Sequence, residues 1–170
     1  MCSSDLVDLL HAECRRAECL VGNVVADAVL EQVRHLGVTA AIQNGGGLRA
    51  SIPRGDVTMG QVLTVLPFQN TIATMGIRGR DLLDALENGV GAAESGSGRF
   101  PQVAGMRFTW DPAAPAGRRI VAVEMRGADG THAPLDPEAV YKVATNQFLD
   151  RKSTRLNSSH VSESRMPSSA

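Results

Sequence analysis

The feature that most constrains this chain is a short apolar segment that runs directly into a cluster of glycines. Residues 38–42 (Val-Thr-Ala-Ala-Ile) have the length and apolar character of a buried strand. The sequence Asn44-Gly45-Gly46-Gly47 follows, and we expect no regular element to continue through it. The fold must therefore hold a glycine-rich turn at the end of a buried strand.

Other segments carry the pattern of helices. Apolar residues recur at helical spacing over residues 23–36, and Gly37 is expected to end that helix. Thr58 is suited to cap a short helix that runs to residue 66 and ends before a proline. Residues 78–90 form the clearest amphipathic helix. Its apolar face is formed by Leu82, Leu83, Leu86 and Val90.

The remaining segments read as strands and a loop. Residues 106–110 and 119–125 alternate in polarity and are predicted to form a hairpin, while residues 71–77 and 140–145 are predicted to be further strands. Residues 91–98 are small and polar, which is typical of a mobile loop. Because helices and strands are interspersed and some strands are antiparallel, the expected class is α+β.

Length and charge narrow the possible partners. A chain of 170 residues suits one domain with a substantial core. The formal net charge of -1 gives no electrostatic reason to expect a nucleic-acid or anionic-membrane partner. No apolar run approaches the roughly 20 residues of a transmembrane helix, so no membrane span is expected.

Both ends of the chain look foreign to the protein. The last stretch, 150–170, is rich in Ser and Arg without apolar periodicity, and by itself it resembles a natural disordered tail. However, residues 150–153 can be encoded by GAT CGG AAG AGC, which is the reverse complement of part of TGC TCT TCC GAT CT, a coding for residues 2–6. One sequencing adaptor read at both ends of a short insert gives this pattern. We therefore expect residues 1–6 and 150–170 to be adaptor-derived, and the domain to span 7–149 with neither end a natural terminus.

Two cysteines remain within that domain. Cys14 and Cys19 are five positions apart, which suits a local disulfide in an exported protein. The alternatives are two free thiols or half of a metal site. A zinc site would need further Cys or His ligands at fitting spacing, and the histidines do not supply them. These histidines are His11, His35, His132 and His160.

The glycine cluster is the first candidate binding element. Glycines allow backbone N–H groups to approach a ligand closely, and the nearby Arg49 could bind a phosphate. The cluster is neither a Walker A loop nor a dinucleotide fingerprint, and a plain turn is the alternative.

Aromatic and basic residues supply the other candidates. Phe68 and Phe148 each lie at the end of an expected element, where they could belong to the core or stack on a base. Arg15 and Arg16 lie between the cysteines, where they could form a solvated face or hold a ligand. No metal cluster of carboxylates with His and no Gly-x-Ser-x-Gly motif is visible. The residues alone therefore indicate a binding module without catalytic groups of its own.

A series of motifs, in order, resembles the C-terminal domain of the 5'-nucleotidase and 2',3'-cyclic-nucleotide phosphodiesterase family. The resemblance covers nearly all of residues 7–149. The motifs are Arg15 with Glu18 to Ala28, Gln43 to Arg49, Gly55 to Thr58, Leu66 to Asn70, the helix from Leu82 to Glu87, Pro101 to Gly105, and Tyr141 to Asn146.

This resemblance implies a mixed sheet with packed helices and a division of labour. In the family, an N-terminal metallophosphoesterase domain holds two divalent metal ions and hydrolyses the substrate, whereas the C-terminal domain captures the nucleotide. No cofactor or catalytic residue is then expected in this chain, and its partners are a nucleotide substrate and the missing N-terminal domain. The parent protein would be a periplasmic or extracellular hydrolase of nucleotide catabolism.

The resemblance also assigns roles to individual residues. Phe68 and Phe148 would stack on either side of the base. Asn44, Gly46 and Gly47 would line the base and ribose pocket. Arg15 and Arg49 would hold the phosphate side, and Cys14 and Cys19 match a disulfide found in some members.

The chain departs from the family at both ends. No metal domain precedes Val7, and after Leu149 the family continues into a Gly-Gly-Asp-Gly turn whose Asp binds the ribose hydroxyls. Asp150 instead opens the adaptor-like tail and does not take that role. We therefore expect the isolated fragment to hydrolyse nothing and to bind nucleotides poorly. The rival hypotheses are a stand-alone nucleotide-binding module, a homologue acting on a different substrate, and a structural remnant without a ligand.

Overall fold

The computed structural model describes residues 13–149. Both expected adaptor-derived ends, and the domain boundary at residue 7, lie outside these residues. The helices are α1 (Leu20–Val33), α2 (Met59–Val65) and α3 (Gly79–Val90), with single 3-10 turns η1 (Glu13–Arg15), η2 (Arg34–Leu36) and η3 (Gly45–Gly47). The strands are β1 (Ala40–Asn44), β2 (Ile72–Arg78), β3 (Pro101–Ala104), β4 (Met106–Trp110), β5 (Ile120–Arg126), β6 (His132–Pro134) and β7 (Val140–Asn146).

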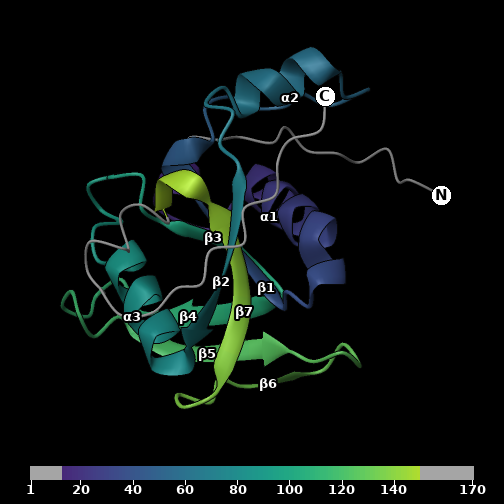
Figure 1. Cartoon of the computed structure of the whole chain (residues 1–170). Coiled ribbons are helices and arrows are strands. Elements are labelled where there is room, and N and C mark those ends of the chain that lie inside the picture. Colours follow the sequence, from purple (N-terminus) through teal and green to yellow (C-terminus); the bar gives the residue numbers. More distant parts are fainter. Residues whose placement is uncertain (1–12, 150–170) are drawn as a thin grey trace.

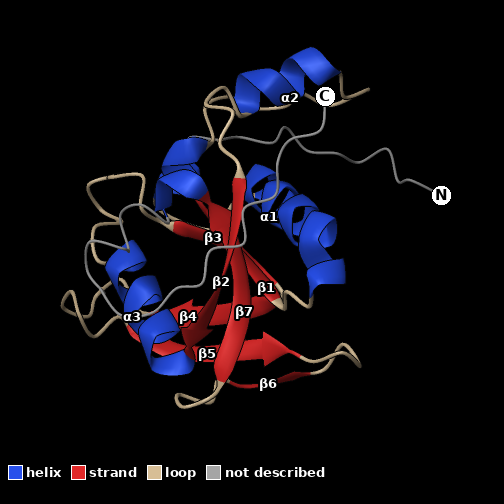
Figure 2. Cartoon of the chain, in the orientation of Figure 1, coloured by secondary structure: helices blue, strands red, loops and turns tan. Residues whose placement is uncertain are grey.

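The strands form two sheets, visible in Figure 2. One has the order β2-β7-β1-β3, with β1 parallel to β7 and the outer pairs antiparallel. The other is the antiparallel sheet β4-β5-β6. Helices together with a mixed sheet confirm the α+β prediction.

The four-stranded sheet is covered on both faces, as alternation along its strands requires. Ala41, Ala104 and Ala144 pack against α1 on one face. The neighbouring Ala40 and Val143 face the other way, toward α3 and the second sheet. The molecule therefore has α1, the mixed sheet, and a layer of α3 with the three-stranded sheet in succession (Figure 1).

Helix ends follow local sequence chemistry. Thr58 caps α2 in a capping box, in which its hydroxyl accepts the N–H of Gln61 while the Gln61 side chain accepts the N–H of Thr58. The helical segment of α1 and η2 ends at Gly37, whose φ of 77° is left-handed. The start of α2 at Thr58 and the end of the first helical segment at Gly37 both agree with the sequence prediction.

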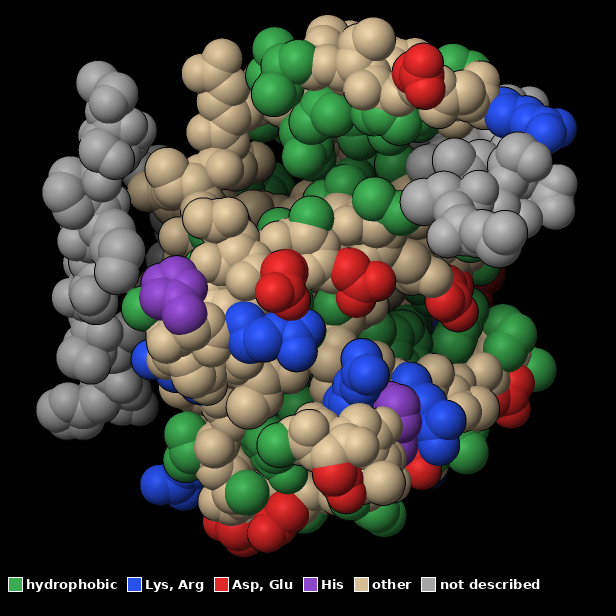
Figure 3. Space-filling model, turned by 90° about the vertical axis from the view of Figure 1, so that its right-hand side faces the viewer, with side chains coloured by type: hydrophobic (Ala, Val, Ile, Leu, Met, Phe, Trp, Pro, Cys, Tyr) green, Lys and Arg blue, Asp and Glu red, His purple; other side chains and the backbone are tan. Residues whose placement is uncertain are grey.

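α2 stands at one end of the molecule (Figure 1), and Val65 is its buried residue. The side chains of Val57, Met59 and Leu63 are exposed, and Figure 3 shows hydrophobic side chains gathered at this end. Within residues 13–149, no helix is both long and apolar enough to cross a membrane.

Some local predictions need correction. Strand β1 was predicted over residues 38–42, but it starts and ends two residues later, and the glycines form the turn η3. The strands β3 and β6 were not expected, because β3 begins with a proline and β6 has three exposed residues. On α3, Leu83 is exposed whereas Leu82 and Leu86 are fully buried, so the apolar face is narrower than predicted.

Candidate functional site

The glycine turn at the end of β1 is packed between two other segments. The N–H of Gly45 donates to the carbonyl of Phe100 at 2.9 Å, and the N–H of Gly46 donates to that of Gly98 at 2.8 Å. A Cβ atom on Gly45 would overlap the carbonyl oxygen of Cys14. Only glycine therefore allows β1 to end against the backbone of the turn that carries Arg15.

Asn44 joins this turn to the end of β7. Its side-chain amide donates to the carbonyl of Gly98 at 3.3 Å, while its oxygen accepts a hydrogen bond from the amide of Asn146 at 2.9 Å. The same Asn146 amide donates to Gln43 at 3.0 Å, and its oxygen accepts the N–H of Leu149 at 3.0 Å. A buried amide network therefore connects the glycine turn with the segment that carries Phe148.

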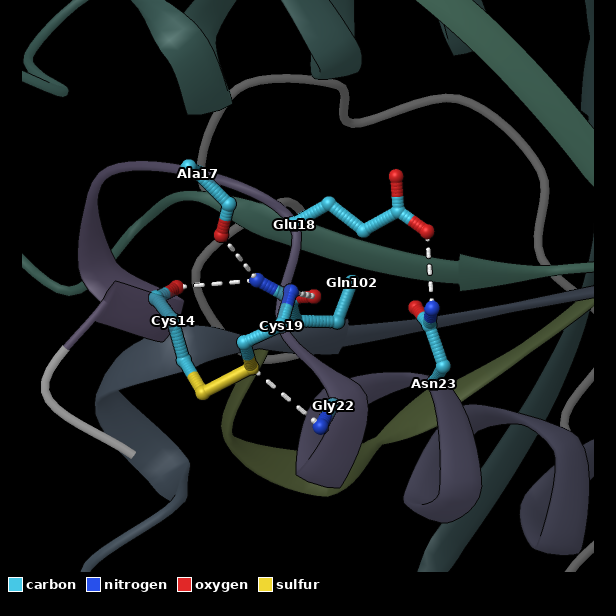
Figure 4. Close-up of a disulfide and its surroundings, with 7 residues drawn as sticks. All are labelled: Cys14, Ala17, Glu18, Cys19, Gly22, Asn23 and Gln102. Carbon is cyan, nitrogen blue, oxygen red and sulfur yellow. Dashed lines mark hydrogen bonds between the residues drawn. A yellow bond between two sulfur atoms is a disulfide. The ribbon is translucent and has the colours of Figure 1, made fainter. Parts of the chain in front are cut away.

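Arg15 lies in a turn closed by a disulfide. Cys14 and Cys19 are joined, with their Cα atoms 5.0 Å apart, and the Cys19 sulfur accepts the N–H of Gly22 at 3.3 Å in the first turn of α1 (Figure 4). Arg15 is half-buried and donates to the carbonyl of Gly96 at 3.3 Å. A surface hollow of about 500 Å³ opens here, lined by Glu13, Arg15, Arg16, Ala17, Ser95 and Gly96.

The loop of residues 91–98 is anchored by Arg119, whose side chain is buried. The Arg119 guanidinium donates to the carbonyls of Val90 at 2.9 Å and Ala114 at 3.0 Å, and it pairs with Glu94. The hydrogen bond from Arg119 lowers the pKa of the Glu94 carboxyl group. A loop that the sequence suggested was mobile is thus tied at its base and at Glu94, so that its carbonyls can face Arg15 and Asn44.

Glu87 holds the start of β5 against α3. Its carboxylate accepts hydrogen bonds from the backbone N–H groups of Gly117, Arg119 and Ile120 at 2.8–3.0 Å. Burial raises the pKa of Glu87, but the three N–H donors and the Arg119 charge outweigh burial and hold the pKa below the ordinary value of 4.5. The segment that carries Arg119 is therefore fixed to the helix that precedes the loop.

Arg49 and Phe68 meet on the other side of the glycine turn. The Arg49 guanidinium lies 6.0 Å from the centroid of the Phe68 ring, and the backbone N–H of Arg49 donates to the carbonyl of Val65 at 2.9 Å. Phe68 is 57% exposed. Together with Gly47 and Asn146, the ring lines a small hollow of about 110 Å³. Cation and ring are thus presented together at the surface.

Two further features mark this side. Gln69, directly after Phe68, has a φ of 49°, a left-handed conformation that is costly for a residue with a side chain. Phe148 follows β7 and is 47% exposed. The segment that carries Phe148 is linked to the amide network through Leu149.

A family model described as the 5'-nucleotidase C-terminal domain matches residues 4–157 of this chain. The chain belongs to the 5'-nucleotidase C-terminal domain family. Members of this family are the C-terminal part of larger proteins, so the resemblance that the motifs indicated is confirmed.

Individual relatives of this 5'-nucleotidase C-terminal domain agree with the match. The Trifunctional nucleotide phosphoesterase protein YfkN of Bacillus subtilis is 39% identical over 136 residues, which are 79% of this chain and 9% of that protein. A snake venom 5'-nucleotidase of Naja atra is 34% identical over 153 residues, or 82% of this chain and 29% of the venom protein. The 5'-nucleotidase precursor from Thermus thermophilus has a similar structure, with a TM-score of 0.81 and 47% identity. That similarity covers 85% of this chain and 29% of the precursor.

Six of the seven predicted site residues of this 5'-nucleotidase C-terminal domain fall into two groups, and the seventh, Phe148, follows β7 at the surface. Arg15 faces the 91–98 loop and the larger hollow, whereas Arg49 and Phe68 meet beside the smaller one. Asn44 and Gly46 contact the same loop as Arg15, and Gly47 lines the smaller hollow. The glycine turn therefore lies between the two groups and connects them.

Sequence reasoning missed three residues that hold this arrangement. They are Gly45, Gln102 and Asn146. Each lies inside a motif that was quoted for the family resemblance, so the available signal was a buried position within a motif. Their partners lie elsewhere in the chain, which is why the motif alone gave them no role.

The resemblance to the family implies two metal ions in an N-terminal domain, and each metal needs a set of donor side chains. Among residues 13–149, no group of three or more His, Cys, Asp or Glu side chains could hold a metal ion. These residues therefore do not fit a metal centre, and no chemical step is assigned to a metal in them.

Proposed function

We propose that this chain is the nucleotide-binding domain of a 5'-nucleotidase-type phosphohydrolase that acts in nucleotide catabolism. The observation that carries the proposal is the placement of an exposed ring and two arginines around one glycine turn, in a member of the 5'-nucleotidase C-terminal domain family. A nucleotide needs a flat apolar surface for its base and cations for its phosphate. The turn has both within reach of one backbone segment.

Arg15 and Arg49 would hold the phosphate side. Arg15 is restrained by the bond to Gly96 and by the disulfide turn, so little side-chain entropy remains to be lost when an anion binds. Arg16 adds a second positive charge to the larger hollow, against the single carboxylate of Glu13. Guanidinium groups suit phosphate because they donate in a planar fork.

Phe68 would stack on the base, together with Phe148. The large exposed fraction of Phe68 is unusual for a core ring but suits a stacking platform, where each ring contributes about 1–3 kcal/mol. Asn44, Gly46 and Gly47 would line the base and ribose pocket between the rings and the arginines. A base-bearing substrate is favoured by the rings over a substrate without a base.

Hydrolysis would be performed outside this chain. The 13–149 segment would bind and orient the nucleotide, while two divalent metal ions in an N-terminal metallophosphoesterase domain would supply the activated water and polarise the phosphoryl group. The chain spans 29% of the Thermus precursor, which leaves room for such a domain in the parent protein. Isolated, the chain should have no phosphohydrolase activity.

The parent protein would work outside the cytoplasm, in the periplasm or the extracellular space. The Cys14–Cys19 disulfide supports this, because disulfides persist in oxidising compartments. A venom protein among the relatives supports it as well.

Nucleotide titration of the full chain tests the proposal. NMR titration with AMP should shift the amide signals of the glycine turn, with the weak affinity expected when this domain is studied on its own. Phe68→Ala should weaken binding of both AMP and adenosine by on the order of tenfold. Arg15→Ala should weaken the binding of AMP while leaving the binding of adenosine unchanged.

Val121→Ala, an exposed apolar residue on the other sheet, is the matched control for Phe68→Ala. Equal binding of AMP by the Phe68→Ala variant and the wild type would refute the stacking role. Release of phosphate from AMP by the purified chain with a divalent metal, above the Phe68→Ala background, would contradict the expected lack of activity.

A further inference from the structure

A buried glutamine on β3 touches the disulfide turn at three backbone groups. Gln102 is 1% exposed, and its amide nitrogen donates to the carbonyls of Cys14 at 3.0 Å and Ala17 at 2.7 Å. Its amide oxygen accepts the N–H of Cys19 at 3.0 Å. Figure 4 shows the side chain reaching into the centre of the turn, beside the disulfide.

This contact supplies a restraint that the disulfide cannot. The bond between Cys14 and Cys19 closes the turn on itself, but it does not tie the turn to the sheet. Gln102 makes that connection, because it lies on β3 opposite Gln43 of β1, one residue before Asn44. Gln102 therefore restrains the position of the disulfide turn relative to the glycine turn, in addition to the close approach of Gly45 to the Cys14 carbonyl.

The Gln102 side chain packs closely against Gly22. A Cβ atom on Gly22, in the first turn of α1, would lie 2.5 Å from the Gln102 side chain. Glycine at position 22 therefore admits the amide to the turn. An acidic residue at position 102 would bring a carboxylate against two carbonyl oxygens, so only an amide satisfies both the donors and the acceptors of the turn.

We propose that Gln102 is a positioning residue for nucleotide recognition, which sets the place of the Arg15 guanidinium relative to Asn44 and the glycine turn. The inference rests on the proposed function, in which Arg15 binds the phosphate. The amide fixes the backbone on both sides of Arg15, and the bond to Gly96 then fixes its tip. Gln102 touches no substrate and acts through Arg15.

The variant Gln102→Met keeps the length of the side chain and removes all three hydrogen bonds. We expect it to lower the ratio of AMP affinity to adenosine affinity by on the order of tenfold, the same loss as Arg15→Ala. In the double variant Gln102→Met/Arg15→Ala this ratio should fall no further than in Arg15→Ala alone, because both changes remove the same interaction between Arg15 and the phosphate.

Leu86→Ala is the control for lost stability without a displaced turn. Leu86 is fully buried in the core between α3 and the second sheet. It should lower the midpoint of thermal unfolding at least as much as Gln102→Met, yet leave the ratio of affinities unchanged. A purely structural Gln102 would behave in the same way as Leu86, and that result would overturn the proposal.

Hydrogen exchange of the wild-type chain tests the same contact without any variant. The Cys19 amide, bonded to Gln102, should exchange as slowly as the amides of β3 and at least tenfold more slowly than the amides of the exposed residues Ala128 and Asp129. Exchange of the Cys19 amide as fast as in those residues would overturn the positioning role. If Arg15→Ala does not change the ratio of affinities, the phosphate role of Arg15 fails instead, and hydrogen exchange still decides whether Gln102 fixes the turn.

Discussion

The two sheets of this domain bury different kinds of polar side chain. The four-stranded sheet buries Gln43, Asn44, Gln102, Thr145 and Asn146, all of them uncharged. Beside the three-stranded sheet, the buried polar residue among residues 13–149 is Arg119, which pairs with Glu94. The amides gather where the glycine turn ends β1, whereas the charges lie where the 91–98 loop is anchored.

This difference indicates that the two sheets have different structural roles. Uncharged amides hold backbone groups at fixed positions without adding a local charge, so the charges near the glycine turn come from side chains at the surface such as Arg15 and Arg49. The charged pair instead fastens a loop from behind. The four-stranded sheet therefore sets the geometry of the candidate site, and the three-stranded sheet supports the loop of residues 91–98 beside it.

The largest effect should come from breaking the contact between the glycine turn and the disulfide turn. In Gly45→Ala the new methyl group overlaps the Cys14 carbonyl, which is backbone and cannot rotate away. We expect the free energy of unfolding, measured by urea denaturation, to fall by about 3 kcal/mol or more.

The control for that variant lies at the tip of the other sheet. Gly117 has a φ of 92° and open space around it, so Gly117→Ala should cost only about 1–2 kcal/mol. If the two variants lost equal stability, the close approach at Gly45 would not matter to the fold.

The amide network should show the next largest effect. Asn146→Leu keeps the branched shape and the number of heavy atoms of the side chain but removes its hydrogen bonds to Gln43, Asn44 and the Leu149 N–H. We expect a loss of about 2 kcal/mol in the free energy of unfolding. The exposed Thr109→Val on β4 serves as the control, and a similar loss there would contradict the special role of the buried amides.

The stabilising effect of the contact between Glu87 and the start of β5 should depend on pH. The pKa of Glu87 in the folded state is lower than its ordinary value of 4.5, so its stabilising contribution is present above about that pH and is lost as the pH falls through the folded value. Glu87→Gln should therefore cost about 1 kcal/mol at neutral pH and less at about pH 3, measured by urea denaturation at both. A difference from the wild type that stays constant with pH would contradict the assignment.

The smallest effect is expected at Gln69. Its left-handed backbone costs roughly 1–2 kcal/mol, whereas glycine adopts it freely but loses more entropy on folding. Gln69→Gly should therefore raise the free energy of unfolding by only about 0.5 kcal/mol, seen as a small rise in the midpoint of thermal unfolding. A loss of stability would show that the Gln69 side chain makes contacts that outweigh the strain.

The parts of the fold that could be predicted from the sequence are those fixed by neighbouring residues. Thr58 caps α2, Gly37 ends the first helical segment, and the alternation over residues 106–110 and 119–125 gives the β4–β5 hairpin. Strand β3 could not be found in this way, because its partner β1 lies about sixty residues earlier and Pro101 hides its start. The position of β7 between β1 and β2 likewise depends on pairing between distant segments.

The same limit applies to the candidate site. The glycine turn, the arginines and the two rings could be named because they belong to motifs that are contiguous in sequence. The contacts that hold these residues in place could not be predicted, because they join distant parts of the sequence. The hydrogen-bond partners of Gln102 in the disulfide turn are 83 to 88 positions away from it, and Asn146 bonds Gln43 and Asn44, which are 102 to 103 positions away. Buried amides give no periodic signal in a sequence, and their partners become visible only once the strands are side by side.

The central place of β7 also bears on how the domain folds. Residues 143–145 pair in parallel with residues 40–42, so the middle of the mixed sheet closes over about a hundred residues of intervening chain. Until β7 is inserted, β1 and β2 both lack a neighbour, and their edges can pair with other chains. During synthesis the glycine turn would therefore emerge from the ribosome early but acquire its final shape only after Asn146 has emerged, which makes the candidate site one of the last parts of the domain to form.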